Sequence, residues 1–154
     1  MRAARVFGLL VLLVQVSSVL AFGLSVYTIF NVASSTASEG AIGLELTIDR
    51  STGIGVLRLR ATPRNAGPLG VDLAIGVGAI DDSGVYITRN STSMHLDAGE
   101  GKPVSLSLRI PGDLMQEMTL KGVEGYFEVT FDIRTLNKMV GVLNTMRIQA
   151  GEPR

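Results

Sequence analysis

Hydrophobic positions are continuous at the start of the chain. Residues 6–38 contain no charged side chain, and Arg2 and Arg5 lie just before them. The most apolar part, residues 6–32, would form a helix of about 27 residues and about 40 Å at a rise of about 1.5 Å per residue. The hydrocarbon core of a bilayer is only about 30 Å thick. The pattern therefore predicts a transmembrane helix over residues 6–32.

The charges beside this segment predict its orientation. Arg2 and Arg5 precede it, and the first acidic residue, Glu39, follows it. Because basic residues favour the cytoplasmic side, we expect the N-terminus in the cytoplasm and everything after the helix outside the cell. A cleaved secretory signal is the competing interpretation, since residues 19–21 and 35–37 resemble cleavage sites. We favour a retained anchor because the apolar region of a signal is usually only about 7–15 residues long.

Small residues recur along one face of the predicted helix. Ser17, Ala21 and Ser25 are spaced four residues apart. Such stripes allow helices to approach closely in lipid. They suggest a contact between helices, and with it a homo-oligomer formed through the membrane segment.

Strict alternation of apolar and polar residues begins after a small, polar stretch at 33–41, which we interpret as a short hinge. Leu44, Leu46 and Ile48, for example, alternate with polar neighbours, as in a half-buried strand. Similar segments recur along the chain, separated by turns rich in glycine and short polar residues, at 57–62, 71–77, 85–87, 94–96, 104–110, 127–133 and 139–149.

The sequence thus predicts a mainly β protein with five parts: a cytoplasmic N-terminus (1–5), a transmembrane helix (6–32), the hinge (33–41), an extracytoplasmic domain (42–150) and a tail (151–154). The expected domain is an antiparallel immunoglobulin-like β-sandwich of about 7–8 strands. Pro111, Asp113 and Gln116 predict one or two helical turns that join the two sheets.

Charge and composition exclude one class of function and indicate a source for the protein. From Glu39 onward the chain holds all fourteen acidic and twelve of the fourteen basic residues, a net charge of −2. This excludes a basic nucleic-acid-binding surface. The chain has no cysteine, so its outer domain must be held together by packing alone. Together with eighteen glycines and no tryptophan, this favours a prokaryotic and, within that, an archaeal source.

Few residues are candidates for chemistry. His95 is the only histidine and lies in a predicted strand, without a second ligand to complete a metal site. Asp81 and Asp82 lack the spacing of a calcium loop and are interpreted as turn residues. Nucleophile-elbow, zinc-protease and phosphate-loop motifs are absent from the sequence. We therefore expect no enzyme activity, no cofactor and no metal.

Asn90 begins the triplet Asn-Ser-Thr, an acceptor for N-glycosylation. It falls in a predicted loop on the outer side of the membrane. Asn90 is therefore a candidate modification site.

Five segments in the first half of the outer domain carry a resemblance to known sandwiches. They are residues 57–67, 70–73, 82–84, 96–100 and 104–108. In them a strand ends in an Asn-containing turn, and a glycine precedes a strand of alternating serine and leucine. The pattern resembles immunoglobulin-like sandwiches of the late-embryogenesis-abundant (water-stress) and bacterial cell-adhesion-related types. That resemblance implies a non-catalytic domain that binds or spaces other molecules.

Two functional hypotheses follow from the sequence. The first is a single-pass membrane protein whose sandwich acts as a binding or structural module at the cell envelope, in contact with the lipid bilayer and another envelope or integral-membrane protein. The alternative is a subunit of a pilin- or flagellin-like filament, or a stator-like accessory component of an archaeal appendage or membrane complex.

Overall fold

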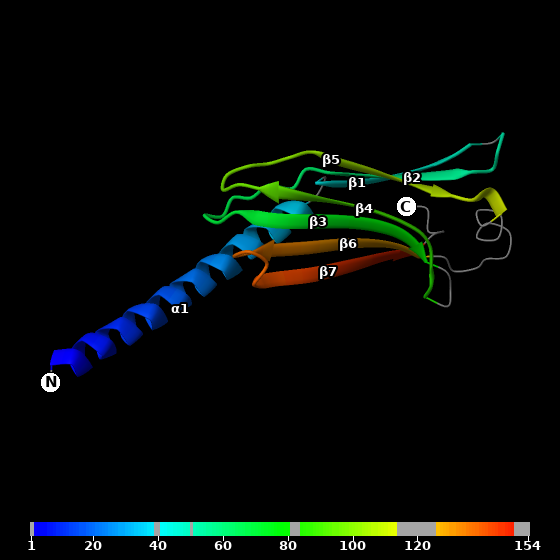
Figure 1. The fold of residues 1–154 in the computed structure, drawn as a ribbon. Coiled ribbons are helices and arrows are strands. Elements are labelled where there is room, and N and C mark those ends of the chain that lie inside the picture. The colour runs from blue at the N-terminus through cyan, green and yellow to red at the C-terminus, as the bar shows by residue number, and fades with distance from the viewer. Residues whose placement is uncertain (1, 39–40, 50, 81–83, 114–125, 150–154) are drawn as a thin grey trace.

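The computed structural model describes all residues except 1, 39–40, 50, 81–83, 114–125 and 150–154. The described residues form a long helix followed by seven strands (Figure 1): α1 (Arg2–Ala37), β1 (Ile42–Ile48), β2 (Gly55–Ala61), β3 (Val71–Ile80), β4 (Tyr86–Leu96), β5 (Val104–Ile110), β6 (Tyr126–Thr135) and β7 (Val140–Gln149).

The strands form two antiparallel sheets that pack face to face. One sheet has the order β1-β2-β5 and the other the order β4-β3-β6-β7. The chain crosses from one sheet to the other after β2, after β4 and after β5, as in immunoglobulin-like sandwiches. The predicted fold class is confirmed.

The core lies between the sheets and is made by the alternating positions of their strands. In β2 and β5, for example, Leu59, Leu108 and Ile110 are at most 2% exposed. The large four-stranded sheet supplies Ile75, Val77, Phe131 and Ile133 to the same cluster, and α1 contributes Ile29 and Val32. The helix therefore belongs to the sandwich core at its C-terminal end.

The structure corrects two predicted boundaries. The segments at 85–87 and 94–96, expected as separate strands, are the two ends of β4. The polar run between them hid this continuity, because β4 is an edge strand with most of its side chains exposed. After β5, Gly112 and Asp113 are helical, and the rest of the predicted helical turns, including Gln116, lies outside the described residues.

The second correction concerns the hinge predicted over residues 33–41. Residues 33–37 belong to α1, and Ala41 donates a backbone hydrogen bond to the Ser38 carbonyl (3.0 Å) just before β1 begins. The helix tolerates small polar residues here because their hydroxyls have partners: Thr36 Oγ1, for example, donates to the Val32 carbonyl (2.7 Å). The helix thus takes up residues 33–37 of the expected hinge.

Asn65 holds together the loops at the end of the sandwich that meets α1. Its side chain is fully buried between β2 and β3. Asn65 Nδ2 donates to the carbonyl oxygens of Leu69 (2.7 Å), Leu96 (3.2 Å) and Asp97 (3.1 Å), and its Oδ1 accepts from the Gly67 backbone N–H (3.0 Å). The amide therefore ties the β2–β3 loop to the end of β4.

We predict that Asn65→Ala lowers the free energy of unfolding by about 3 kcal/mol, because it leaves several buried backbone groups without a partner. Asn90→Ala is the control: Asn90 Nδ2 donates one exposed hydrogen bond, to the Ser107 carbonyl (2.8 Å), so its loss should cost less than about 1 kcal/mol. Denaturant unfolding followed by circular dichroism measures both. Equal losses in the two variants would contradict the role given to Asn65.

Candidate binding surfaces

The last turns of α1 pack against the sandwich through one face. Ser25, Thr28, Ile29, Val32 and Thr36 are at most 6% exposed. Their spacings of three and four residues place them in one stripe along the helix. The rest of α1 projects away from the sandwich as a rod (Figure 1).

The β2–β3 loop, residues 62–70, forms part of the surface on which the end of α1 packs, together with β6 and β7, and we call it the helix-contact loop. Ser35 Oγ donates to the Arg64 carbonyl (2.8 Å) and accepts from the Arg64 backbone N–H (3.3 Å). Gly67 touches Thr28 so closely that an added Cβ would lie 2.7 Å from the Thr28 Cα. Glycine is therefore required here, and the helix and loop are in direct backbone contact.

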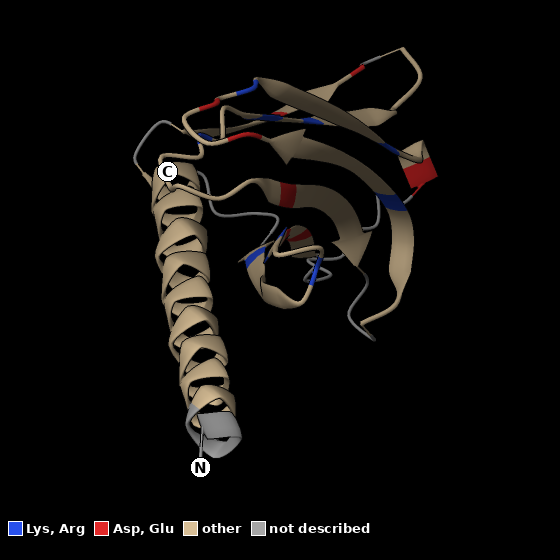
Figure 2. Ribbon diagram, turned by 60° about the vertical axis from the view of Figure 1, so that its left-hand side comes forward, with Lys and Arg blue, Asp and Glu red and all other residues tan. Residues whose placement is uncertain are grey.

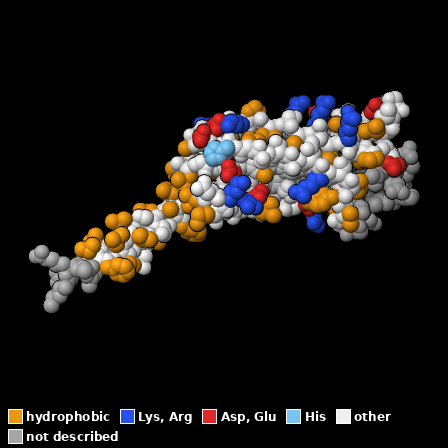
Figure 3. Space-filling view, in the orientation of Figure 1, with side chains coloured by type: hydrophobic (Ala, Val, Ile, Leu, Met, Phe, Trp, Pro, Cys, Tyr) orange, Lys and Arg blue, Asp and Glu red, His pale blue; other side chains and the backbone are white. Residues whose placement is uncertain are grey.

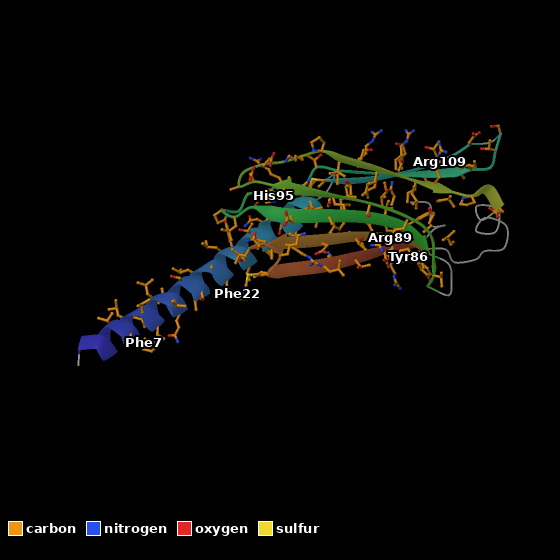
Figure 4. All side chains as sticks on the ribbon, in the orientation of Figure 1. Phe7, Phe22, Tyr86, Arg89, His95 and Arg109 are labelled. Atoms are coloured by element: carbon orange, nitrogen blue, oxygen red, sulfur yellow. The ribbon has the colours of Figure 1, made fainter. Side chains whose placement is uncertain are left out.

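Beyond this contact the helix is uncharged and mostly apolar on every side. Side chains at residues 6–24 are exposed, apart from the half-buried Ala21, and Phe7 and Phe22 point away from the sandwich (Figure 4). No Lys, Arg, Asp or Glu lies on the described helix between Val6 and Ala37, whereas both signs of charge are scattered over the sandwich (Figure 2). By length and composition, α1 is able to cross a membrane.

One side of the sandwich is open, and its first wall is β1. Leu44 pairs with Leu59 and Leu46 pairs with Leu57, so these leucines share the inner face of their sheet. Leu57 and Leu59 are at most 3% exposed, yet Leu44 is 37% and Leu46 is 43% exposed. The inner face of β1 is therefore not covered by the opposite sheet.

The second wall is β7. Val142, Met146 and Ile148 pair with the core residues Ile133, Val129 and Phe127 of β6 and share their inward face. All three are nevertheless between 37% and 47% exposed. Because β1 and β7 each pair with a single described strand, both walls also present a free backbone edge.

An apolar groove runs between these two walls, and we call it the β1–β7 groove. Near α1 it includes a cavity of about 170 Å³ lined by Ala33, Ala37, Ile42 and Val142 among others. A second cavity of about 310 Å³ reaches Leu44, Met146 and Ile148. The groove thus begins at the end of α1. On the opposite side, β4 and β5 approach each other and are bridged by the Asn90–Ser107 hydrogen bond.

A polar depression of about 370 Å³ lies on the outer face of the four-stranded sheet, and His95 is part of its lining. Figure 3 shows the single histidine of the chain near the end of the sandwich from which the helix projects. His95 Nδ1 is 2.7 Å from Asp72 Oδ1, and His95 Nε2 is 3.5 Å from Asp97 Oδ1. The hydrogen bond with Asp72 is the main reason that the pKa of His95 is raised, and the nearby Asp97 charge adds to it. Arg134 lines the same depression and is paired with Asp132 (2.8 Å).

Farther from the helix on the same face, Glu128 of β6 connects β4 and β7 through its carboxylate. Its carboxylate accepts hydrogen bonds from the Tyr86 hydroxyl and from Arg147 Nε (3.0 Å), and Arg89 lies over the Tyr86 ring, 5.1 Å from its centroid (Figure 4). The Tyr86 hydrogen bond is the main cause that lowers the pKa of Glu128, and it raises the pKa of Tyr86. A carboxylate occupied on both oxygens is suited to holding β4, β6 and β7 together.

The structure places the residues singled out in the sequence as follows. Asn90 is exposed but lies within β4, so the predicted loop position was wrong, and its glycosylation stays a prediction. In the small-residue stripe, Ser17 is exposed and Ala21 half-buried, whereas Ser25 is fully buried within a single chain. Ser25 is therefore not free for a contact with another helix, and a contact at Ser17 and Ala21 stays a prediction.

Asp81 and Asp82, which the sequence predicts to be turn residues and not calcium ligands, lie outside the described residues. Within the described part of the chain, no group of three or more histidine or acidic side chains is arranged to hold a metal ion. His95 lies near the carboxylates of Asp72 and Asp97 on an exposed surface. Among the described residues, these three side chains do not form a metal-binding group.

Comparison with known proteins gives the fold and no family. No protein-family model matches the chain, and no curated protein matches it. Solved structures with a similar fold include a β-glucuronidase from Bacteroides uniformis and Bacteroides uniformis β-glucuronidase 2 covalently bound to cyclophellitol-6-carboxylate aziridine. Both have a TM-score of 0.52 and 13% sequence identity.

These matches cover 71% of this chain and only 13% of each glucuronidase chain. The chain therefore spans a small part of the length of those enzymes. At such low identity the likeness concerns the β-sandwich architecture alone.

We predict that Gly67→Val separates α1 from the helix-contact loop, because the new side chain would overlap the Thr28 backbone. Spin labels at Tyr27→Cys and Lys138→Cys, both exposed positions, report the geometry by pulsed electron resonance. The unmodified loop should give a narrow distance distribution and Gly67→Val a broad one. Gly84→Val is the control, because a Cβ added at Gly84 meets nothing within 4 Å. Gly84 has a positive φ, so circular dichroism is used to check that the Gly84→Val variant folds. An unchanged narrow distribution in Gly67→Val would contradict a fixed joint.

We predict that His95 titrates above its ordinary pKa of 6.5 and that Asp72→Asn brings the pKa back toward that value. Because the folded pKa is raised, the His95–Asp72 pair stabilises the fold fully below about pH 6.5, and this contribution is lost as the pH rises through the folded pKa. Proton NMR of the single imidazole measures the titration. Asp132→Asn is the control, as Asp132 pairs with Arg134 instead. The same pKa shift in both variants would contradict the assignment.

Proposed function

We propose that this protein is a single-pass, membrane-anchored β-sandwich that acts as a non-catalytic binding or structural module at the cell envelope. The N-terminus lies in the cytoplasm and the sandwich outside. The observation that carries the proposal is the way in which α1 divides into two parts. One part is uncharged and mostly apolar on every side, and the other has one face buried against the sandwich.

The length of the free part matches a bilayer. Residues 6–24 make a helix of about 28 Å, close to the hydrocarbon thickness of about 30 Å. The next exposed helix side chains include Tyr27 and Phe30, which are 56% and 69% exposed. Aromatic residues are favoured at the membrane–water boundary. This supports a membrane surface at the level where α1 meets the helix-contact loop.

The rigid joint gives the module its physical role. A sandwich on a flexible tether would sample many orientations, whereas packing of Ile29 and Val32 into the core fixes the domain relative to the membrane-spanning rod. The β1–β7 groove then opens at the membrane surface, beside the end of α1. Such a placement suits a contact with another envelope or integral-membrane protein.

We predict that the two ends of the chain react differently with a membrane-impermeant maleimide. The protein has no native cysteine, so single cysteines can be introduced cleanly. Ser105→Cys, on the exposed face of β5, should be labelled on intact cells, and Ala3→Cys only after the membrane is permeabilised.

Equal labelling of both positions on intact cells, or extraction of the protein by alkaline carbonate, would contradict the proposal. The mature N-terminus, determined by mass spectrometry, separates the alternatives. A start within residues 22–38 would show a cleaved signal, and removal of the first few residues with assembly into fibres would show a filament subunit.

A further inference from the structure

The β1–β7 groove is left uncovered by the described residues of a single chain, although its side chains lie on the inward faces of the two sheets. Six of them are large and apolar and between 37% and 50% exposed: Leu44, Leu46, Ile48, Val142, Met146 and Ile148. Among the described residues, no charged side chain lines either of its two cavities. Monomeric proteins seldom leave such a continuous apolar surface in water.

We propose that the occupant of the groove is a second copy of this chain, in a symmetric dimer that closes both open sandwiches at once. The proposal rests on the membrane anchorage given under Proposed function. Two copies in one bilayer have the same orientation, so a twofold axis that relates them must run along the membrane normal.

The directions of the two walls fit this symmetry. β1 begins at Ile42, which lines the cavity beside Ala33 and Ala37 of α1, and β7 enters the same cavity at Val142. Both strands then run away from the helix (Figure 1). A twofold axis along the membrane normal preserves this direction. It places β1 of one copy beside β7 of the other in parallel, and the reverse pair forms at the same time.

The two walls are also complementary, because each has an unpaired strand edge and an uncovered inner face. Each is an edge strand that pairs with a single described neighbour, so each offers unpaired backbone donors and acceptors. Each turns uncharged and mostly apolar side chains toward the opening, and Asn144 is the polar exception on β7. One contact would therefore satisfy the strand edges and cover the inner faces of β1 and β7. Because the same patch occurs on both copies, the assembly is closed and stops at two.

The test uses cysteine cross-linking in native membranes. Two differently tagged copies are expressed together, one carrying Leu46→Cys and the other Met146→Cys, and an oxidant is added. The expected result is a disulfide-linked dimer that contains both tags. The control pair is Ser105→Cys with Met146→Cys, because Ser105 lies on the outer face of the three-stranded sheet and should not cross-link.

A matched pair of substitutions measures the strength of the contact. Leu46→Asp places a charge in the groove, while Thr47→Asp places one on the opposite face of the same strand. We expect Leu46→Asp to raise the dimer dissociation constant at least tenfold in reconstituted bilayers and Thr47→Asp to leave it within twofold. Circular dichroism confirms that both variants fold, which is expected because both positions are exposed in the single chain.

The absence of the mixed disulfide overturns the proposal, whatever else occupies the groove. So does an internal disulfide in a monomer that carries both cysteines, since it would show that the chain closes its own sandwich. A complex with a different protein that requires Leu46 would likewise replace the second copy as the occupant. Maleimide labelling of Ser105→Cys on the same intact cells tests the membrane anchorage separately. If Ser105→Cys is labelled but no mixed disulfide forms, the dimer is wrong and the anchorage stands.

Discussion

Burial of the last turns of α1 against the sandwich is the interaction on which the rest of the structure depends. Ile29 and Val32 enter the same core as the strands, and Gly67 lets the helix-contact loop touch the helix at Thr28. Asn65 in turn fixes that loop to the end of β4. The joint therefore sets three properties together: the length of helix that stays exposed, the position of the sandwich relative to that rod, and the direction in which the β1–β7 groove opens.

The sequence predicts the elements well because their signals are local. A long uncharged apolar run indicates the helix, and alternation indicates the strands whichever sheet they join. The hinge was predicted wrongly because residues 33–37 are small and polar, and their helical state depends on packing by residues distant in sequence, as the Ser35–Arg64 hydrogen bonds show. Local composition does not contain that contact.

The candidate site was harder to predict for the same reason. Leu46 and Leu57 occur in equally regular alternating segments and pair with each other, yet one is 43% and the other 3% exposed. Alternation reports which side chains face the interior, and it carries no information on whether the opposite sheet reaches far enough to cover them. Likewise, the spacing of Ser17, Ala21 and Ser25 indicated a close contact of the helix. The structure assigns Ser25 to a contact within the chain.

We propose a boundary near Leu24 between the membrane-spanning part of α1 and the part, from Ser25 onward, that is held by the sandwich. It is tested most directly by a spin-label scan along residues 6–37 in lipid bilayers, in which collisions with oxygen report lipid and collisions with a water-soluble nickel complex report solvent. We expect spin labels to be accessible to oxygen up to Leu24. Labels at Ser25, Thr28, Ile29, Val32 and Thr36 should be protected from both reagents. Continuous lipid accessibility as far as Val32, followed by free water accessibility over residues 33–37, would contradict it.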